Sequence, residues 1–330
     1  MKTYLITGGA GFIGANFILY MLKKYKEIKI INYDKLTYAA DIKNLKEVEN
    51  NDNYIFIQGD ICDKERLYEV FNKFNIDYVV NFAAESHVDR SIDNPYNFVR
   101  TNIEGTFILL DTFKNFWQDS YQKSNDKKYL QISTDEVYGS LGEEGYFTEQ
   151  SSICPRSPYS ASKTSADMLV KSYYYTYGLP INITRCSNNY GPFQHKEKLI
   201  PMTIYNCINE KNIPIYGDGL NVRDWIYVKD HCRAIDLVLN KGINGEVYNI
   251  GCHNEKTNLD IVNLIIDILN ELGKYKINKN IISHVKDRLG HDRRYAIDSS
   301  KLHNLGWQPY VSFEEGLKNT IIWYMKKFSN

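Results

Sequence analysis

The chain has 330 residues, of which 43% are hydrophobic and 24% are charged, a composition typical of a globular protein with a sizeable core. Its 40 basic residues balance its 40 acidic ones, so we expect neither nucleic acid nor a membrane surface as a partner. No apolar run approaches the roughly 20 residues of a membrane span, and residues 1–7 lack the length and cleavage site of a signal peptide.

Short apolar runs alternate with longer amphipathic segments through the first half of the chain. This alternation predicts an α/β fold with a Rossmann-type, doubly wound parallel sheet. The predicted strands are residues 4–7, 29–34, 54–60, 78–83, 129–134 and 181–186, and the predicted helices are residues 12–25, 64–74, 98–117 and 159–177. Polar loops are expected at residues 50–53 and 118–128.

The rhythm becomes irregular after Cys186, where the turn-rich sequence Asn-Asn-Tyr-Gly-Pro follows. We therefore expect a first domain over residues 1–187 and a smaller α+β domain over residues 188–330. A helix at 228–241 and a strand at 246–250 suggest that segment 225–250 returns to the main sheet.

The first motif is Thr-Gly-Gly-Ala-Gly-Phe-Ile-Gly, which ends the first strand and opens a helix. In this context Gly8, Gly11 and Gly14 predict a dinucleotide site, because they allow a tight turn and close backbone approach to a pyrophosphate. Asp34 ends the second strand twenty residues after Gly14, where a carboxylate can bind the adenosine ribose and repel a 2′-phosphate. NAD is therefore favoured over NADP, a preference that the adjacent Lys35 weakens slightly.

Two of these acidic positions also have a simpler interpretation. Asp34 can be a turn or helix-cap residue. Asp60 and Ile61, at the end of the third strand, could contact adenine or equally form a strand-end turn.

A second set of residues predicts the chemistry. Tyr159 and Lys163 lie four residues apart on one helix face, where a nearby ammonium favours the phenolate. With a nicotinamide cation, Lys163 could lower the phenol pKa from about 10 toward 7. Thr134 ends the fifth strand and could bind the same substrate hydroxyl. Asp135 and Glu136 follow it, and could serve as acid and base for an elimination or simply form an acidic turn.

The six scattered cysteines contain no CxxC pair, so we expect reduced thiols, no metal site and a cytoplasmic protein. Each cysteine is predicted to be a small buried residue.

These motifs resemble those of the extended short-chain dehydrogenase/reductases, and within them the dTDP-glucose 4,6-dehydratases, along nearly the whole chain. The matching segments are 7–14, 33–39, 83–91, 132–139, 157–163, 186–192, 197–201, 216–219, 223–225 and 290–295. The Asp-Glu pair after Thr134 is the most specific of them. Ala40-Asp41 departs from the usual Gly-Asn, and Leu289 from the usual proline.

The resemblance implies NAD-dependent dehydration of dTDP-glucose to dTDP-4-keto-6-deoxyglucose, a step of dTDP-rhamnose biosynthesis. Tyr159, with Thr134 and Lys163, would deprotonate the C4 hydroxyl while hydride passes to NAD. Glu136 would remove the C5 proton and Asp135 would protonate the C6 hydroxyl, after which hydride returns to C6. The resemblance also implies a homodimer joined through the 159–177 helix.

It further implies which residues bind, with an NAD-binding first domain and a nucleotide-sugar-binding second domain. The implied cofactor residues beyond the glycines and acids are Phe12, Ile13, Lys35, Leu36, Thr37, Ala83, Ala84, Ser86, Thr101, Tyr159, Lys163 and Asn189. The implied substrate residues are Ser86, Thr134, Asn188, Lys198, Leu199, Tyr216, Arg223, Asn258, Arg288 and His291.

Other functions remain open from the sequence. A 4,6-dehydratase for a UDP-, CDP- or GDP-hexose is the nearest alternative. A nucleotide-sugar 4-epimerase or decarboxylase is disfavoured by the Asp-Glu pair, and a catalytically silent NAD-binding regulatory protein by the full catalytic set.

Overall fold

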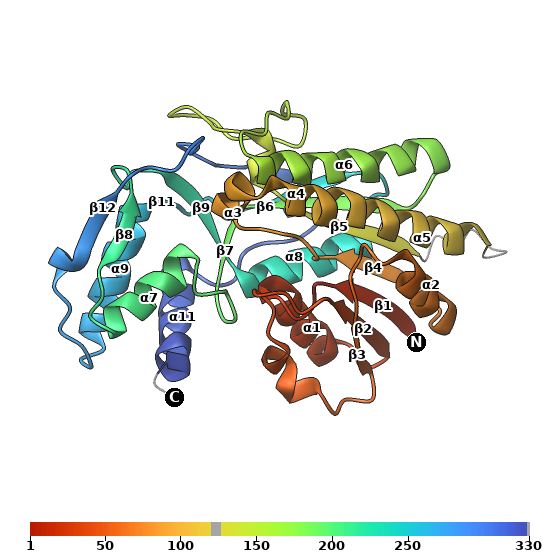
Figure 1. The fold of residues 1–330 in the computed structure, drawn as a ribbon, viewed down its shortest axis with the longest axis horizontal. Helices are drawn as coiled ribbons and strands as arrows, with labels where there is room; N and C mark the ends of the chain where they lie inside the picture. Colours follow the sequence, from red (N-terminus) through yellow and green to blue (C-terminus); the bar gives the residue numbers. More distant parts are fainter. Residues whose placement is uncertain (120–126, 329–330) are drawn as a thin grey trace.

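The main sheet of the computed structural model is parallel throughout and has the strand order β10-β6-β5-β4-β1-β2-β3 (Figure 1). The structure describes residues 1–119 and 127–328. The strand order reverses between β1 and β4, which confirms the predicted doubly wound sheet. The strands are β1 (Lys2–Thr7), β2 (Ile28–Asp34), β3 (Tyr54–Gln58), β4 (Tyr78–Asn81), β5 (Lys128–Thr134), β6 (Ile181–Cys186) and β10 (Val247–Ile250).

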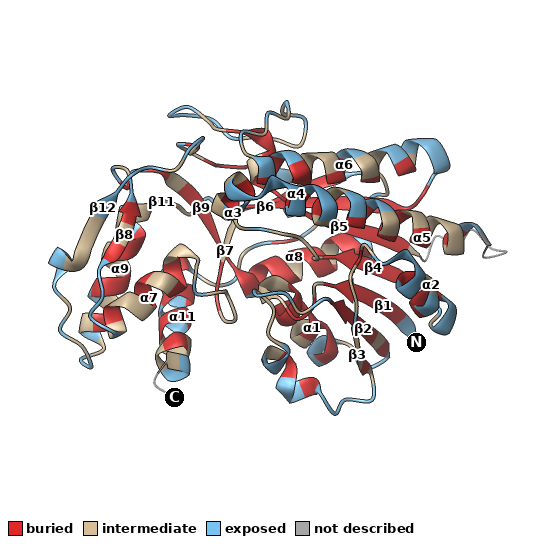
Figure 2. Cartoon of the chain, in the orientation of Figure 1, coloured by how far each residue is buried: buried red, intermediate tan, exposed pale blue. Residues whose placement is uncertain are grey.

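Helices cover both faces of this sheet, and each face has its own apolar core. The neighbouring residues Leu5 and Ile6 of β1 point into different cores, as the continuous apolar strands require. One core includes residues of α1 (Phe12–Lys24) and α8 (Val228–Lys241). The other includes residues of α2 (Lys64–Lys73), α5 (Thr106–Asp119) and α6 (Pro158–Tyr177). Figure 2 shows the buried sheet between these layers.

The predicted helix over residues 98–117 is divided in the structure. The chain forms α4 (Pro95–Phe98), a π-helical stretch η2 (Val99–Gly105) and then α5. Within η2 the buried Asn102 donates to the Glu85 carbonyl and accepts from the Glu85 N–H, at 3.0 and 2.8 Å. Such π-bulges often occur at functional sites, and here it brings a polar side chain to the loop after β4.

Strands β3 and β4 each end two residues earlier than predicted, at Gln58 and Asn81. Residues 50–53 form a loop, as predicted. The predicted loop at 118–128 falls mostly outside the described residues.

The rest of the chain forms smaller sheets beyond the end of β6, on the left of Figure 1. Three helices pack around a separate apolar core there, and α8 and β10 lie with the main sheet. The strands are β7 (Asn188–Tyr190), β8 (Ile213–Tyr216), β9 (Val222–Tyr227), β11 (Glu255–Thr257) and β12 (Ile282–Val285). The helices are α7 (Leu199–Ile208), α9 (Asn258–Glu271) and α11 (Phe313–Phe328). Short helices are η1 (Ile42–Val48), α3 (Val88–Asp93), η3 (Asp135–Tyr138), η4 (Lys279–Ile281) and α10 (Ser300–Asn304).

Helix α6 is fixed at both ends and in its middle. Ser157 forms a capping box at its start, and Gly178 ends it in the left-handed region at φ 69°. In the middle, Asp167 accepts from Nε of Arg185 on β6 at 2.9 Å, and both side chains are almost fully buried. Breaking such a buried pair costs about 3–5 kcal/mol. The Arg185 guanidinium also lies 4.8 Å from the Tyr138 ring centre, which connects α6 to η3.

All six cysteines lie within the described residues and carry free thiols. Cys186, Cys207 and Cys232 are buried as predicted, and Cys62 and Cys252 are partly buried. The prediction is wrong for Cys154, which is exposed because it lies in the loop that joins η3 to α6. Across the part of the chain that the structure describes, no helix has the length and apolar character to cross a membrane.

Candidate active site

A cleft runs along the carboxyl ends of the strands, where the sheet order reverses, and the space along it is about 1610 Å³ with the open solvent at its mouth included. The predicted residues that line it are Gly8, Gly11, Phe12, Ile13, Gly14, Asp34, Lys35, Thr37, Asp60, Ile61, Ala83, Ala84, Ser86, Thr101, Thr134, Asp135, Glu136, Tyr159, Lys163, Asn188, Asn189 and Lys198.

Other predicted residues do not line this cleft. Leu36 adopts φ 58° and its N–H donates to Asp34, so its role is in the turn after β2. Leu199 begins α7 and Asn258 begins α9. Arg223 and Arg288 lie near Glu136. Tyr216 and His291 lie next to each other in a separate polar group.

The glycine loop has the shape of a phosphate cradle. Gly8 has φ 67°, and a Cβ there would lie 2.7 Å from the Ala83 nitrogen. A Cβ on Gly14 would lie 2.4 Å from the Gly8 carbonyl oxygen. Only glycine fits at these two positions, and Gly11 caps the start of α1 without a side chain. The first N–H groups of α1 can therefore face a pyrophosphate directly.

Asp34 forms the turn contacts that its position suggested. Its carboxylate is 6% exposed and accepts from the N–H of Ala10 at 2.9 Å and of Leu36 at 2.7 Å. Burial raises the pKa of Asp34, and these two bonds oppose the rise. The carboxylate thus holds the glycine loop in place, and each oxygen keeps a lone pair for a ribose hydroxyl.

Lys35 is drawn away from Asp34. Its ammonium lies 2.8 Å from a carboxylate oxygen of Asp60. Although burial acts to raise the pKa of Asp60, Lys35 and the Cys62 N–H outweigh it and lower that pKa. Because Lys35 is paired with Asp60, its ammonium is held away from Asp34 and from a 2′-phosphate there, and the site fits NAD.

Asn189 is oriented by a histidine that the sequence did not indicate. The buried His231 has Nδ1 2.8 Å from the Asn189 amide oxygen. Burial lowers the pKa of His231 to about 3, so the ring is neutral and its Nδ1–H can donate. The Asn189 amide nitrogen donates to the Ser187 carbonyl at 3.0 Å.

Tyr159, Lys163 and Thr134 meet in the cleft. The Lys163 ammonium donates to the Ile132 carbonyl at 2.7 Å and is 5% exposed. Burial, and then the charge of Glu136, raises the pKa of the Tyr159 phenol well above its ordinary value, while Thr134 lowers it. The protein alone therefore keeps the phenol protonated, and the expected fall of its pKa requires a further positive charge beside it.

Asp135 and Glu136 occupy η3, which Thr134 caps by accepting from the Glu136 N–H at 3.3 Å. Burial, Glu136 and Asp224 raise the pKa of Asp135 well above its ordinary value. Burial also raises the pKa of Glu136, but the nearby cations Arg288, Arg223 and Lys198 oppose it. Within the described residues nothing hydrogen-bonds Oδ2 of Asp135. The two carboxyl groups are thus suited to opposite tasks, Asp135 as an acid and Glu136 as a base.

Three cations surround Glu136 from different elements. Arg223 of β9 is 5% exposed and donates to the carbonyls of Val222 and Asp292 at 2.7 and 3.0 Å. Lys198 donates to the Ser86 carbonyl at 3.0 Å. Arg288 lies 3.8 Å from Asp89. Their convergence gives the otherwise neutral chain a local anion site.

His291 and Tyr216 lie together near these cations. Nδ1 of His291 is 2.7 Å from an Asp287 oxygen, and its ring is 6.2 Å from that of Tyr216. The Tyr216 hydroxyl donates to Asp89 at 3.2 Å, the same residue that faces Arg288.

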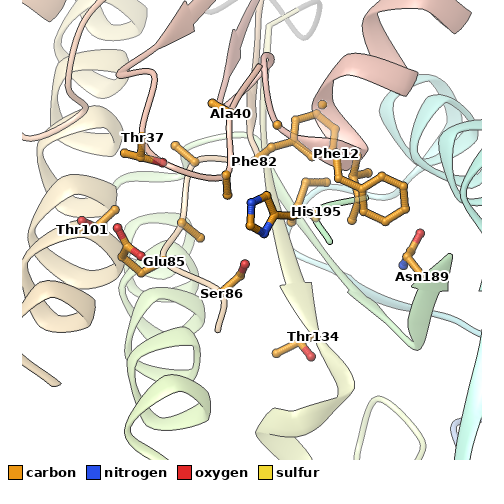
Figure 3. Close-up of a pocket in the computed structure, with 18 of the residues that line it drawn as sticks. Phe12, Thr37, Ala40, Phe82, Glu85, Ser86, Thr101, Thr134, Asn189 and His195 are labelled. Atoms are coloured by element: carbon orange, nitrogen blue, oxygen red, sulfur yellow. The ribbon is translucent and has the colours of Figure 1, made fainter. Parts of the chain in front are cut away.

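The cleft also contains residues that the sequence argument missed. Figure 3 shows Phe82, Glu85 and His195 among the side chains that line it. Strand-end position could have indicated Phe82, Ser133 and Ser187, but no local pattern indicates the 194–197 loop. The missed residues are Tyr33, Ala39, Ala40, Gly59, Phe82, Glu85, Ile132, Ser133, Cys186, Ser187, Gln194, His195 and Glu197.

The two departures from the family pattern, Ala40-Asp41 and Leu289, have different surroundings in the structure. Asp41 caps η1 by accepting from the Lys43 N–H at 3.0 Å, and its own N–H donates to the Ala10 carbonyl. Leu289 is 70% exposed in the segment before Gly290.

A Rossmann sheet with a glycine-rich loop, a buried acid at the end of β2 and a buried Tyr159–Lys163 pair is typical of an extended short-chain dehydrogenase/reductase. The family model described as GDP-mannose 4,6 dehydratase matches residues 5–320. A dTDP-glucose 4,6-dehydratase of Haemophilus influenzae is 50% identical over 98% of both chains. The chain belongs to the family of nucleotide-sugar 4,6-dehydratases and groups with the dTDP-glucose 4,6-dehydratases.

Solved structures agree with this assignment. A dTDP-glucose 4,6-dehydratase from Bacillus anthracis, in complex with NAD, is 48% identical with a TM-score of 0.89, covering 100% of this chain and 98% of that one. The enzyme DesIV from Streptomyces venezuelae, with NAD and TYD bound, is 41% identical with a TM-score of 0.92, covering 99% and 98%. The predicted resemblance is confirmed.

The raised pKa of Asp135 predicts that this residue destabilises the protein at neutral pH. The folded state keeps the proton that the unfolded state loses, so stability falls as pH rises from the ordinary value of about 4 toward the raised folded pKa. Asp135→Asn should therefore increase the free energy of unfolding at pH 7 by roughly 1–2 kcal/mol and have no such effect at pH 4. Urea denaturation at both pH values measures this. The exposed Asp52→Asn is the control, and an equal effect of Asp135→Asn at both pH values would contradict the prediction.

Proposed function

We propose that the protein is an NAD-dependent dTDP-glucose 4,6-dehydratase that forms dTDP-4-keto-6-deoxyglucose. One observation carries the proposal: the carboxyl pair Asp135 and Glu136 shares a cleft with Tyr159 and Lys163. Oxidation of an alcohol needs only the tyrosine and the lysine, whereas loss of water needs an acid and a base as well. The relatives that are 48–50% identical to this chain are named dTDP-glucose 4,6-dehydratases, and this supports dTDP-glucose as the substrate.

NAD is the cofactor that the residues fit, held by the glycine loop, Asp34 and the strand-end residues of the cleft. When bound, it would supply an acceptor for the C4 hydride of the sugar, a donor of hydride to C6 and a positive charge near the phenol. The glycine loop binds the pyrophosphate through the N–H groups of α1. Asp34 binds the adenosine ribose, and Asn189 presents an amide whose orientation His231 fixes.

The chain's own groups move the protons. Tyr159 takes the proton of the C4 hydroxyl, Thr134 hydrogen-bonds the same oxygen, and Lys163 stabilises the phenolate. The C4 ketone then acidifies the C5 proton, which Glu136 removes. Asp135 gives its proton to the C6 hydroxyl, so water leaves, and Glu136 later returns a proton to C5. The pKa of Asp135 is raised further than that of Glu136, which matches these roles.

The cations around Glu136 suit the nucleotide diphosphate and sugar. Arg223 and Arg288 can bind phosphate oxygens in bidentate fashion, and Lys198 supplies a point charge beside Ser86. Asn188 and Ser86 line the same cleft. Leu199, Tyr216, Asn258 and His291 belong to the nucleotide end of the site.

Residues 1–187 with the returning segment 225–250 are the proposed NAD-binding domain, and 188–330 the nucleotide-sugar-binding domain. The proposed location is the cytoplasm, where nucleotide sugars for 6-deoxyhexose pathways such as dTDP-rhamnose biosynthesis are made.

A homodimer is proposed through α5 and α6, which lie side by side (Figure 1). Their outer surface carries large apolar side chains, among them Phe107, Met168 and Tyr175, which are 44%, 40% and 74% exposed. Tyr173, on the inner side of α6, is buried in the core and does not contribute to this surface. Exposed apolar residues on two adjacent helices favour self-association by helix packing.

The dimer is tested by a charge on this surface. Met168→Arg should shift the mass measured by light scattering from dimer to monomer, because a guanidinium would be buried without a partner. Val285→Arg, at a residue 38% exposed on β12 at the other end of the molecule (Figure 1), is the matched control. An unchanged dimer in Met168→Arg would exclude this interface.

The proposed activity is tested by incubating the protein with dTDP-glucose, UDP-glucose, CDP-glucose and GDP-mannose. We expect dTDP-glucose to give the fastest loss of one water, detected as a lighter product by mass spectrometry. Faster reaction with another nucleotide would reassign the substrate. An epimerised product of unchanged mass would exclude a dehydratase.

The role of Glu136 is tested by Glu136→Gln, which keeps the size of the side chain and removes the base. The absorbance of the reduced nicotinamide should still appear, and the rate of water loss should fall by about 100-fold or more. Deuterium from heavy water should no longer enter at C5. Asp52→Gln serves as the control, and normal dehydration by the Glu136 variant would make this assignment wrong.

A further inference from the structure

Two segments far apart in the sequence meet across the mouth of the cofactor cleft. Thr37 and Ala40, between β2 and η1, line one side, and His195 and Glu197, between β7 and α7, line the other. Figure 3 shows the His195 ring in the middle of the cleft view. Tyr38 spans the two sides, because its hydroxyl donates to Oε1 of Glu197 at 3.2 Å. Its ring also meets the His195 ring edge-to-face at 5.5 Å.

Arg90 of α3 completes this contact from a third segment. Its guanidinium lies 3.6 Å from the centre of the Tyr38 ring, and one of its nitrogens is 3.6 Å from Oε2 of Glu197. A single carboxylate thus faces a tyrosine hydroxyl, an arginine and two histidine rings, His195 at 3.6 Å and His87 at 3.8 Å. Burial and the charge of Glu197 raise the pKa of Tyr38, so its hydroxyl stays a donor.

Each side of the contact is attached to a part of the dinucleotide site. On the first side, the Asp41 N–H donates to the carbonyl of Ala10 in the glycine loop at 3.0 Å. On the second side, the Gln194 amide donates to the Asn189 carbonyl at 2.9 Å. Movement of either side therefore changes access to the space between Asp34 and Asn189.

We propose that Tyr38, Arg90 and Glu197 form a clasp over the cofactor cleft that must open before the dinucleotide leaves. The clasp sets the dissociation rate of NAD. This inference rests on the proposed function for the identity of the dinucleotide. A cofactor that is regenerated in each turnover gains nothing from exchange, and a slow release keeps the enzyme loaded.

The clasp is unlike the bonds that hold the fold together. Tyr38 is 39% exposed, and the Arg90 side chain is 51% exposed. Polar contacts at such exposure contribute little to folding. Substitutions here should leave the protein folded and act on the dissociation rate, because opening the clasp breaks all of its contacts at once.

The test is the exchange of bound NAD. Protein saturated with radiolabelled NAD is mixed with excess unlabelled NAD, and retained label is followed by rapid filtration. Tyr38→Phe removes the hydroxyl and keeps the ring under Arg90, and we expect the label to leave roughly five- to tenfold faster. Glu197→Ala, which removes the acceptor, should act in the same direction. The double variant should be no faster than the faster single variant, because both changes break one contact.

Tyr310→Phe is the matched control, since Tyr310 also lies 3.6 Å below an arginine guanidinium, that of Arg233, and does not line the cleft. Exchange in Tyr38→Phe at the rate of the wild type and of this control would overturn the clasp. Multiplied effects in the double variant would show two independent contacts and also overturn it. Wild-type protein that retains no labelled NAD and forms no dehydrated product would instead refute the proposed function, so the two failures are distinguishable.

Discussion

The buried ion pair between Asp167 and Arg185 holds α6 against β6, and the arrangement of the site depends on it. The pair lies one helical turn after Lys163, whose ammonium reaches the Ile132 carbonyl on the neighbouring strand. Arg185 also packs against Tyr138, the last residue of the turn that carries Asp135 and Glu136. A shift of α6 would therefore move Tyr159 and Lys163 relative to Asp135 and Glu136. The charges are costly to bury, and their mutual pairing makes one position of the helix strongly preferred.

Burial is the second property that organises the site. It raises the pKa of Tyr159, Asp135 and Glu136, and it acts against the charge of Lys163. The protein by itself thus holds the tyrosine and Asp135 protonated. The proton of Asp135 is then available for a leaving hydroxyl, whereas the phenol needs the positive charge of a bound cofactor before it can accept one. Such a site cannot begin the reaction efficiently until its cofactor is bound, which agrees with the clasp proposed above.

Much of the fold followed from the sequence, because strands buried on both faces are continuous apolar runs and the helices between them are amphipathic. The strand β6 and the helix α8 were placed at their observed bounds. The prediction of one continuous helix over residues 98–117 was wrong, because residues 99–105 form a π-helical stretch. In this stretch Asn102 hydrogen-bonds to Glu85, a contact made only in the folded chain. The predicted burial of Cys154 was also wrong, because no local sequence pattern indicates whether a loop residue is exposed.

For the site, the sequence by itself determined the residues whose chemistry needs a fixed local spacing: the glycines of the loop, Asp34 at a strand end, the Tyr159–Lys163 turn and the acidic pair after Thr134. Only the tertiary structure decided which charges meet them. Arg223, Arg288 and Lys198 approach Glu136 from three separate segments, and Lys35 turns from Asp34 to Asp60. The contact of Tyr38 with Glu197 joins residues 159 positions apart. Local spacing is set by backbone geometry within one element, whereas electrostatic neighbours are set by how the elements pack.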